Sequence, residues 1–348
     1  SNFPKVCNLS NAVERTLTTH WERPIIPPLV IRAILRKQFL SFGLRWFAGP
    51  SFLLAGKDAN LIAVNNVSFN LKHGETLGLV GESGSGKTTV GRCVLRLIEP
   101  TEGRVTLDGE DVTTLDATRL RDLRANMQLV FQDPFGSLNP RLTVSQTVEE
   151  PLKLHGMVRA ERHERVGEMM RLVGLSEHFY HYYPADLTAS EQQRVGIARA
   201  LATKPEFVVL DEPTSMLDPS ARAEILDLLK EIQKELGTAY IFISHDLTSV
   251  AKLSHRIAIM YLGHIVEHAP TDIIMHSQRH PYSRALLSAV LFPDPKRPPD
   301  PYVIEGEIPT AINPKPECRC SHNHIDLLFT PLLQDAFKIN TTYHFVHP

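Results

Sequence analysis

The chain is poor in cysteine, carries almost no net charge and has no long uninterrupted apolar run. Its 348 residues include only four cysteines, Cys7, Cys93, Cys318 and Cys320. That number is too small for a disulfide scaffold of this size and favours a reducing, cytoplasmic compartment. Lys and Arg total 37 against 39 Asp and Glu, so no global field draws the chain to nucleic acid or anionic lipid.

The N-terminal region resembles neither a membrane span nor a signal peptide. The most apolar early stretch, residues 29–55, is interrupted by the four basic residues Arg32, Arg36, Lys37 and Arg45, which makes insertion into a bilayer costly. Residues 1–28 lack a basic start followed by an apolar block. If the protein serves a membrane, we expect it to do so from outside the bilayer.

Short apolar runs alternate with helical patterns along the chain. The predicted buried strands are Thr76–Val80, Phe207–Leu210, Ala239–Ser244 and Ile257–Tyr261. The predicted helices include Thr88–Leu97, the region from Pro134 to Asp186, and a helix that Asp218 caps and Gly237 ends. Strands without polar alternation, separated by helices, predict an α/β fold with a parallel sheet.

Composition divides the chain into three parts. Residues 1–28 form an N-terminal extension and residues 29–291 a main domain. Within that domain, residues from about 134 to 187 form a helical region. From residue 292 to 348 the pattern becomes loop-rich, with frequent proline, and indicates a C-terminal extension.

A complete phosphate-binding motif follows the first buried strand. The motif G-x-x-x-x-G-K-[ST] is formed by Gly81, Glu82, Ser83, Gly84, Ser85, Gly86, Lys87 and Thr88, and we include Thr89 among the candidate nucleotide-binding residues. The glycines let backbone N–H groups converge on an anion at a helix N-terminus. Lys87 would reach the β- and γ-phosphates, and the Thr88 hydroxyl would hold Mg²⁺. The strand before the loop and the helix after it argue against a chance glycine-rich turn.

A pair of carboxylates ends the second buried strand. Asp211 would help to hold Mg²⁺, and the adjacent Glu212 would polarise an attacking water. Alone, an apolar run that ends in Asp-Glu fits any strand edge. Together with the phosphate loop, it predicts ATP hydrolysis with Mg²⁺ as the metal.

Three further residues occur around the loop in a fixed order: Gln132, Asp218 and His245. With the loop, they resemble the motifs of the ATP-binding cassette (ABC) ATPases over most of residues 30–316. The resemblance implies that Gln132 senses γ-phosphate and metal, that Asp218 lies at a dimer interface, and that His245 contacts γ-phosphate. Phe39 falls where this family has an aromatic that stacks on adenine, and a core phenylalanine fits the position equally well.

The same resemblance implies a fold. It is a P-loop NTPase (RecA-like) core with an antiparallel β subdomain, an inserted helical subdomain and a C-terminal extension. Two stretches are similar to the dipeptide and oligopeptide importer ATPases. They are residues 131–141 and the tail that begins at His280-Pro281-Tyr282 and continues to Glu305-Gly306-Glu307.

This subfamily implies a set of partners. They are two transmembrane permease subunits, a second ABC ATPase subunit and a periplasmic or extracellular substrate-binding protein, with the chain peripheral on the cytoplasmic face of the inner membrane. The cargo would be a peptide or the related nickel or glutathione. A soluble cassette ATPase acting on nucleic acid is the alternative of another class, but the chain shows no basic arm or zinc module.

The signature segment departs from the family pattern. Where family members have Leu-Ser-Gly-Gly-Gln, this chain has Leu187 followed by Thr188, Ala189, Ser190 and Glu191. In the family this segment caps the ATP held by the opposite subunit. Here two Cβ atoms and a negative charge would face that phosphate, which favours a catalytically asymmetric heterodimer. Thr188-x-x-Glu191 also fits a capping box, so an ordinary helix start with normal function stays open.

The C-terminal cysteines leave a second question open. Cys318, Cys320, His322 and His324 resemble a metal-binding set, and related importers often carry a cysteine cluster here. Residues two apart in a strand are about 6.6 Å apart, too far for shared tetrahedral ligation. An iron–sulfur cluster usually needs four thiolates, so a metal-free tail is favoured.

Overall fold

The computed structural model describes residues 29–39 and 61–289. The predictions for residues 1–28 and 292–348, including those for Cys318 and Cys320, lie outside the described residues. Among the described residues, none of the helices combines the length and the apolar character that a bilayer span requires.

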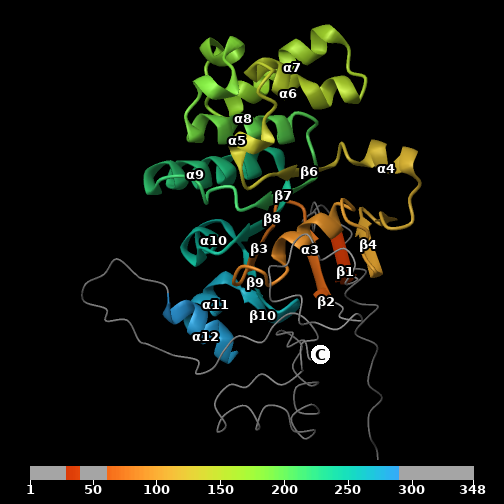
Figure 1. Ribbon diagram of the computed structural model, residues 1–348, viewed down its shortest axis with the longest axis vertical. Helices are drawn as coiled ribbons and strands as arrows, with labels where there is room; N and C mark the ends of the chain where they lie inside the picture. The colour runs from red at the N-terminus through yellow and green to blue at the C-terminus, as the bar shows by residue number, and fades with distance from the viewer. Residues whose placement is uncertain (1–28, 40–60, 290–348) are drawn as a thin grey trace, which may run out of the picture.

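A six-stranded sheet in the order β10-β9-β3-β8-β7-β6 forms the centre of the described fold (Figure 1). Its strands are β3 (Thr76–Val80), β6 (Met127–Val130), β7 (Phe207–Asp211), β8 (Ala239–Ser244), β9 (Arg256–Tyr261) and β10 (His264–Pro270). All neighbours pair in parallel except β10, which runs antiparallel to β9 at the edge. The predicted α/β fold with a parallel sheet is confirmed.

A second, antiparallel sheet has the order β2-β1-β4-β5. It consists of β1 (Leu29–Phe39), β2 (Leu61–Lys72), β4 (Glu102–Leu107) and β5 (Glu110–Asp111). Helix α3 lies between the two sheets, because its buried side chains Val90, Cys93 and Val94 belong to the same apolar cluster as β1 and β3. Burial raises the pKa of the Cys93 thiol to about 11, so this buried cysteine stays protonated.

The α-helices pack against these sheets. They are α3 (Lys87–Val94), α4 (Ala117–Leu123), α5 (Pro134–Ser137), α6 (Val144–Leu154), α7 (Arg159–Leu172), α8 (Ala189–Leu201), α9 (Pro219–Leu236), α10 (Leu247–Leu253), α11 (Thr271–Ser277) and α12 (Pro281–Ser288). Helices α5 to α8 gather at one end of the molecule, and α11 and α12 at the other (Figure 1). The predicted helical character of residues 134–186 is confirmed.

Helix α3 ends earlier than the sequence predicted. The expected helix ran to Leu97, but α3 stops at Val94, and Arg96 takes a left-handed conformation with φ 48°. The Arg96 guanidinium donates hydrogen bonds to the carbonyl oxygens of Val112 and Leu115. This long-range anchor turns the chain out of the helix, and no local pattern signals it.

Side chains of the parallel strands alternate between two apolar clusters. Phe207 and Val209 of β7 pack with α3 and the antiparallel sheet, while Val208 and Leu210 face the cluster that contains α8 and α9. This alternation is the two-residue period of a strand buried on both faces. The strand backbone is thereby fixed from both sides, which holds the loops at its carboxyl end in place.

Helix α10 packs closely against the central sheet at Gly78 of β3. A Cβ at this position would lie 2.3 Å from Val250 Cγ1 and 2.6 Å from Ser254 Oγ, so α10 would have to move. We expect Gly78→Ala to lower the free energy of unfolding by about 2 kcal/mol, measured by urea denaturation. Gly196 of α8 is the matched control, because a Cβ there meets no atom within 4 Å. Gly196→Ala should raise stability by up to about 1 kcal/mol, and equal effects of the two substitutions would contradict this packing.

Candidate functional site

The predicted site residues come from loops that follow four neighbouring strands. Lys87 follows β3, Gln132 follows β6, Asp211 and Glu212 end β7, and His245 follows β8. Because β3, β8, β7 and β6 are parallel neighbours, their carboxyl ends lie at one edge of the sheet. A ligand is expected at such an edge in an open α/β sheet.

The phosphate loop packs closely against neighbouring strands at two of its glycines. Gly81 and Gly86 have φ values of 152° and 102°. A Cβ on Gly81 would lie 2.2 Å from the Met260 carbonyl oxygen, and one on Gly86 equally close to that of Ala63. Only glycine fits both positions, so strands β9 and β2 force the loop into its narrow turn.

Lys87 is buried at the first position of α3. Its ammonium donates hydrogen bonds to the carbonyl oxygens of Gly81 (2.7 Å) and Glu82 (2.8 Å). Burial lowers the pKa of Lys87, and the nearby carboxylates of Glu212 and Asp211 oppose that shift. The carbonyl groups of the loop therefore hold the charged end of Lys87 beside the loop.

Thr88, which is partly buried, and the buried Asp211 bring two oxygen donors together. The Thr88 hydroxyl donates to Asp211 Oδ1 at 2.9 Å. Burial raises the pKa of Asp211, and the hydrogen bond from Thr88 partly offsets this. A hydroxyl and a carboxylate at the end of a phosphate loop are the hard oxygen donors that suit Mg²⁺. The residues present thus fit a magnesium ion.

The Glu212 carboxylate contacts residues from two other loops of the site. Gln132 Nε2 donates to Glu212 Oε2 at 3.1 Å, and His245 Nδ1 lies 3.3 Å from the same oxygen. Glu212 has φ 47°, an uncommon conformation for a residue other than glycine, and its N–H donates to the Ile243 carbonyl oxygen. Three loops therefore converge on one carboxylate.

The signature segment forms the N-terminus of α8. Thr188 caps the helix: its hydroxyl accepts the Glu191 N–H, and Glu191 Oε2 accepts the Thr188 N–H and hydroxyl, both at 2.8 Å. The capping box predicted from the sequence is confirmed. Glu191 is thus turned back onto the start of its own helix, where Ala189 is exposed. Asp218 also caps a helix, accepting the N–H groups of Ser220 and Ala221 at the start of α9.

Phe39 ends β1, where its backbone pairs with Leu61. The position of its side chain lies outside the described part of the chain.

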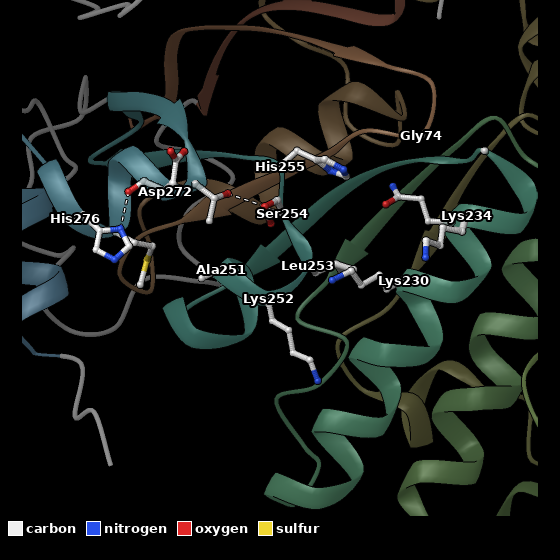
Figure 2. Close-up of a pocket in the computed structure, with 14 residues that line it drawn as sticks. Gly74, Lys230, Lys234, Ala251, Lys252, Leu253, Ser254, His255, Asp272 and His276 are labelled. Atoms are coloured by element: carbon white, nitrogen blue, oxygen red, sulfur yellow. Dashed lines mark hydrogen bonds between the residues drawn. The ribbon is translucent and has the colours of Figure 1, made fainter. Parts of the chain in front are cut away.

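A separate cavity of about 960 Å³ lies at the opposite edge of the parallel sheet. Gly74 and Gly237, which precede β3 and β8, contribute to its wall together with Lys230, Lys234 and His255 (Figure 2). It opens beside the amino ends of the strands, whereas the phosphate loop follows a carboxyl end. The cavity is therefore not the site that the sequence motifs form.

Two family models match the chain. Residues 64–215 match the ABC transporter family, and residues 266–323 match the C-terminal region of the oligopeptide/dipeptide transporter family. A relative from Sinorhizobium fredii, described as a probable peptide ABC transporter ATP-binding protein, is 47% identical over 257 residues, covering 74% of this chain and 73% of the relative. The chain belongs to the ABC transporter ATPases.

Other relatives and solved structures agree with this membership. The oligopeptide transport ATP-binding protein AppF of Bacillus subtilis is 43% identical over 79% of this chain and 84% of its own length. A dimeric ATP-binding cassette in a post-hydrolysis state with ADP and phosphate has a TM-score of 0.59 and 30% identity, covering 69% of this chain and 98% of that one. The cassette cbiO1 from Clostridium perfringens has a TM-score of 0.60 and 26% identity, over 72% and 91% of the two chains.

One contact to the phosphate loop of this ABC ATPase was not predicted. The hydroxyl of Tyr282 in α12 accepts the backbone N–H of Glu82 at 3.1 Å. In the sequence, Tyr282 is recognisable only as part of the resemblance to the peptide importer ATPases. The His280-Pro281-Tyr282 motif was the available signal, but its contact with residues 200 positions away cannot be seen in one sequence.

The capping box at α8 can be tested separately from catalysis. Glu191→Ala should lower the free energy of unfolding of this ABC ATPase by about 1 kcal/mol, because the Thr188 N–H loses its acceptor. Glu191→Gln should stay within about 0.5 kcal/mol of the natural chain, because an amide oxygen still accepts the bond. Urea unfolding of both variants without nucleotide is the measurement. Equal losses would mean that Glu191 stabilises the helix through its charge and not through the cap.

Proposed function

We propose that this ABC ATPase is the ATP-hydrolysing subunit that energises a binding-protein-dependent importer of the dipeptide and oligopeptide class. The observation that carries the ATPase assignment is the carboxylate of Glu212, which meets Gln132 and His245 beside an intact phosphate loop. The match of residues 266–323 to the oligopeptide/dipeptide transporter region supports the peptide class.

The phosphate loop would hold the triphosphate of ATP. The N–H groups of the loop and of the first turn of α3 would donate to phosphate oxygens, and the α3 dipole favours negative charge there. The Lys87 ammonium, already held at the loop carbonyls, would lie against the β- and γ-phosphates. By the family resemblance, Phe39 would stack on adenine.

Thr88 and Asp211 would hold Mg²⁺, with Gln132 as a third polar group at its edge. When bound, the ion neutralises charge that develops on the β- and γ-phosphate oxygens. The hydrogen bond between Thr88 and Asp211 keeps both oxygen donors oriented before the ion arrives. Burial of Asp211 limits the competition from bulk water at this site.

Glu212 would act as the general base. Its carboxylate accepts a proton from water as the water oxygen bonds to the γ-phosphorus and the bond from that phosphorus to the β–γ bridging oxygen breaks, which yields ADP and inorganic phosphate. Gln132 fixes the carboxylate by donating to Oε2. His245, largely exposed on the adjacent loop, can donate to a γ-phosphate oxygen.

Removal of the base gives the first test of this mechanism. We expect Glu212→Gln to lower ATP turnover at least ~100-fold, the scale of a lost general base. ATP binding should persist, because the amide keeps an acceptor oxygen for Gln132. The measurements are phosphate release and equilibrium binding of ATP by the same preparation. Turnover equal to that of the natural chain would remove Glu212 from the mechanism.

A cytoplasmic helix of the permease, which has two subunits in the assembly, would dock in a groove formed by Gln132 and the helical segment from Pro134 to Asp186. Phe131, next to Gln132, and Phe135 of α5 are 45% and 65% exposed. Leu154 at the end of α6 and Val158, which precedes α7, are also exposed. Exposed large apolar side chains are typical of interaction surfaces. Because Gln132 contacts Glu212, such a partner would be coupled to the state of the site. We infer that the chain acts on the cytoplasmic face of the membrane, with a substrate-binding protein on the other side.

The signature supports an asymmetric heterodimer. In a head-to-tail pair, this chain's own loop, Glu212 and His245 would act on one ATP, and the segment 188–191 would face the ATP of the second ABC ATPase subunit. The side chains of Ala189 and Ser190 add bulk there. The Glu191 carboxylate occupies the start of α8 and reduces the attraction of that helix end for phosphate.

Restoration of the signature tests the asymmetry. We expect replacement of Thr188, Ala189, Ser190 and Glu191 by Ser-Gly-Gly-Gln to raise turnover in the assembled transporter about fivefold or more, since about 1 kcal/mol of repulsion is relieved. Glu191→Gln alone keeps the capping box and reports the effect of charge. Nucleotide binding by the isolated chain is the control and should not change. Unaltered or lower turnover would mean that the divergent segment is competent as it stands.

A further inference from the structure

The His280-Pro281-Tyr282 motif has no part in the mechanism described above, yet it begins a helix that reaches the phosphate loop. Helix α12 lies within residues 266–323, the part that matches the oligopeptide/dipeptide transporter region. It lies beside α11 at the end of the molecule away from the α5–α8 group (Figure 1). Its contact with the loop joins the two matched regions of the chain.

The first two residues of the motif, His280 and Pro281, help to orient Tyr282. His280 caps α12, its Nδ1 accepting the Tyr282 N–H at 3.2 Å, and Pro281 occupies the first turn. Glu267 of β10, itself buried, accepts the N–H groups of Arg279 and His280 at 2.8 and 3.1 Å. The turn into α12 is therefore anchored to the edge of the central sheet.

The Tyr282 side chain is fixed by packing as well as by its backbone. It is 5% exposed, and its ring lies against the Tyr261 ring of β9 with centroids 4.5 Å apart. Burial raises the pKa of Tyr282 to about 12, so the hydroxyl keeps its proton. A neutral hydroxyl at a fixed position therefore faces the loop.

One peptide unit of the loop is held at both of its polar ends. The N–H of Glu82 donates to the Tyr282 hydroxyl at 3.1 Å, while the carbonyl oxygen of Gly81, in the same peptide plane, accepts from Lys87 Nζ at 2.7 Å. Rotation of this plane would break both bonds. Because a hydrogen bond at the N–H polarises the carbonyl, each bond also strengthens the other.

We infer that Tyr282 is a positioning residue for ATP binding, which acts by holding the Gly81–Glu82 peptide plane and through it the Lys87 ammonium. The inference rests on the proposed role of Lys87 at the phosphates. In this role Tyr282 would act through the loop backbone and not by contact with the nucleotide. The C-terminal region thereby contributes to the geometry of the phosphate loop.

Tyr282→Phe tests the hydroxyl while the ring stays in place. In the full chain, we expect the Kd for a fluorescent ATP analogue and the KM for ATP to rise about fivefold, the scale of one lost hydrogen bond. The kcat should change less than twofold. Tyr240→Phe is the matched control, because the Tyr240 hydroxyl is equally buried, has no hydrogen-bond partner among the described residues, and lies near the amino end of β8, away from the phosphate loop. Its Kd and KM should equal those of the natural chain.

A double-mutant cycle with Lys87→Met separates positioning from general loss of structure. If Tyr282 acts through Lys87, Tyr282→Phe should have little further effect on nucleotide binding once Lys87 is replaced. Equal effects in both backgrounds, or a Tyr282→Phe variant that binds like Tyr240→Phe, would overturn the inference. The proposed function would survive either result, because in this cycle it is contradicted by a different outcome, namely a Lys87→Met variant that binds ATP like the natural chain.

Discussion

Parallel pairing of β3, β8, β7 and β6 is the constraint on which the site depends. In sequence, the four functional loops are separated by insertions that include the whole α5–α8 group. The sheet brings their carboxyl ends to one edge, and apolar contacts on both faces prevent the strands from shifting in register. As a result, Gln132 and His245 reach the same oxygen of Glu212. The sheet positions their two loops, so the loops need not contact each other.

The charges of the site are held in place by neutral groups, which are backbone carbonyls for Lys87 and a side-chain hydroxyl for Asp211. Lys87 is buried against two loop carbonyl oxygens, and the buried Asp211 carboxylate accepts from Thr88. Each charge is therefore oriented before any ligand binds, which reduces the reorganisation that catalysis requires. The glycines at positions 81 and 86 allow this arrangement, since a side chain at either would collide with a neighbouring strand. The same backbone links the loop to α12 through Tyr282.

Much of this arrangement could be predicted from sequence, because it depends on local patterns. Strands Thr76–Val80 and Ala239–Ser244 have the predicted bounds, and the caps at Asp218 and Thr188 are formed as their spacing indicated. Local patterns failed where distant contacts decide the structure. Arg96 ends α3 through carbonyl groups beyond β5. The apolar stripe predicted for α9 was Ile225, Leu228, Ile232 and Leu236, but Leu228 and Leu236 are only partly buried, while Leu226 and Leu229, outside that stripe, are buried. The Tyr282 contact is also long-range, and the roles of the site residues stay predictions.

Uptake of a labelled oligopeptide into proteoliposomes tests the central claim most directly. The vesicles would contain this chain with its permease and second ATPase subunits, oriented so that the ATPases face the supplied nucleotide, with the binding protein on the opposite side. We predict that peptide crosses the membrane toward the ATPase side with ATP and not with a non-hydrolysable analogue, because hydrolysis of the β–γ phosphoanhydride, with Glu212 as general base, supplies the energy. Equal peptide movement with the analogue, or ATP hydrolysis with no peptide movement, would contradict the account.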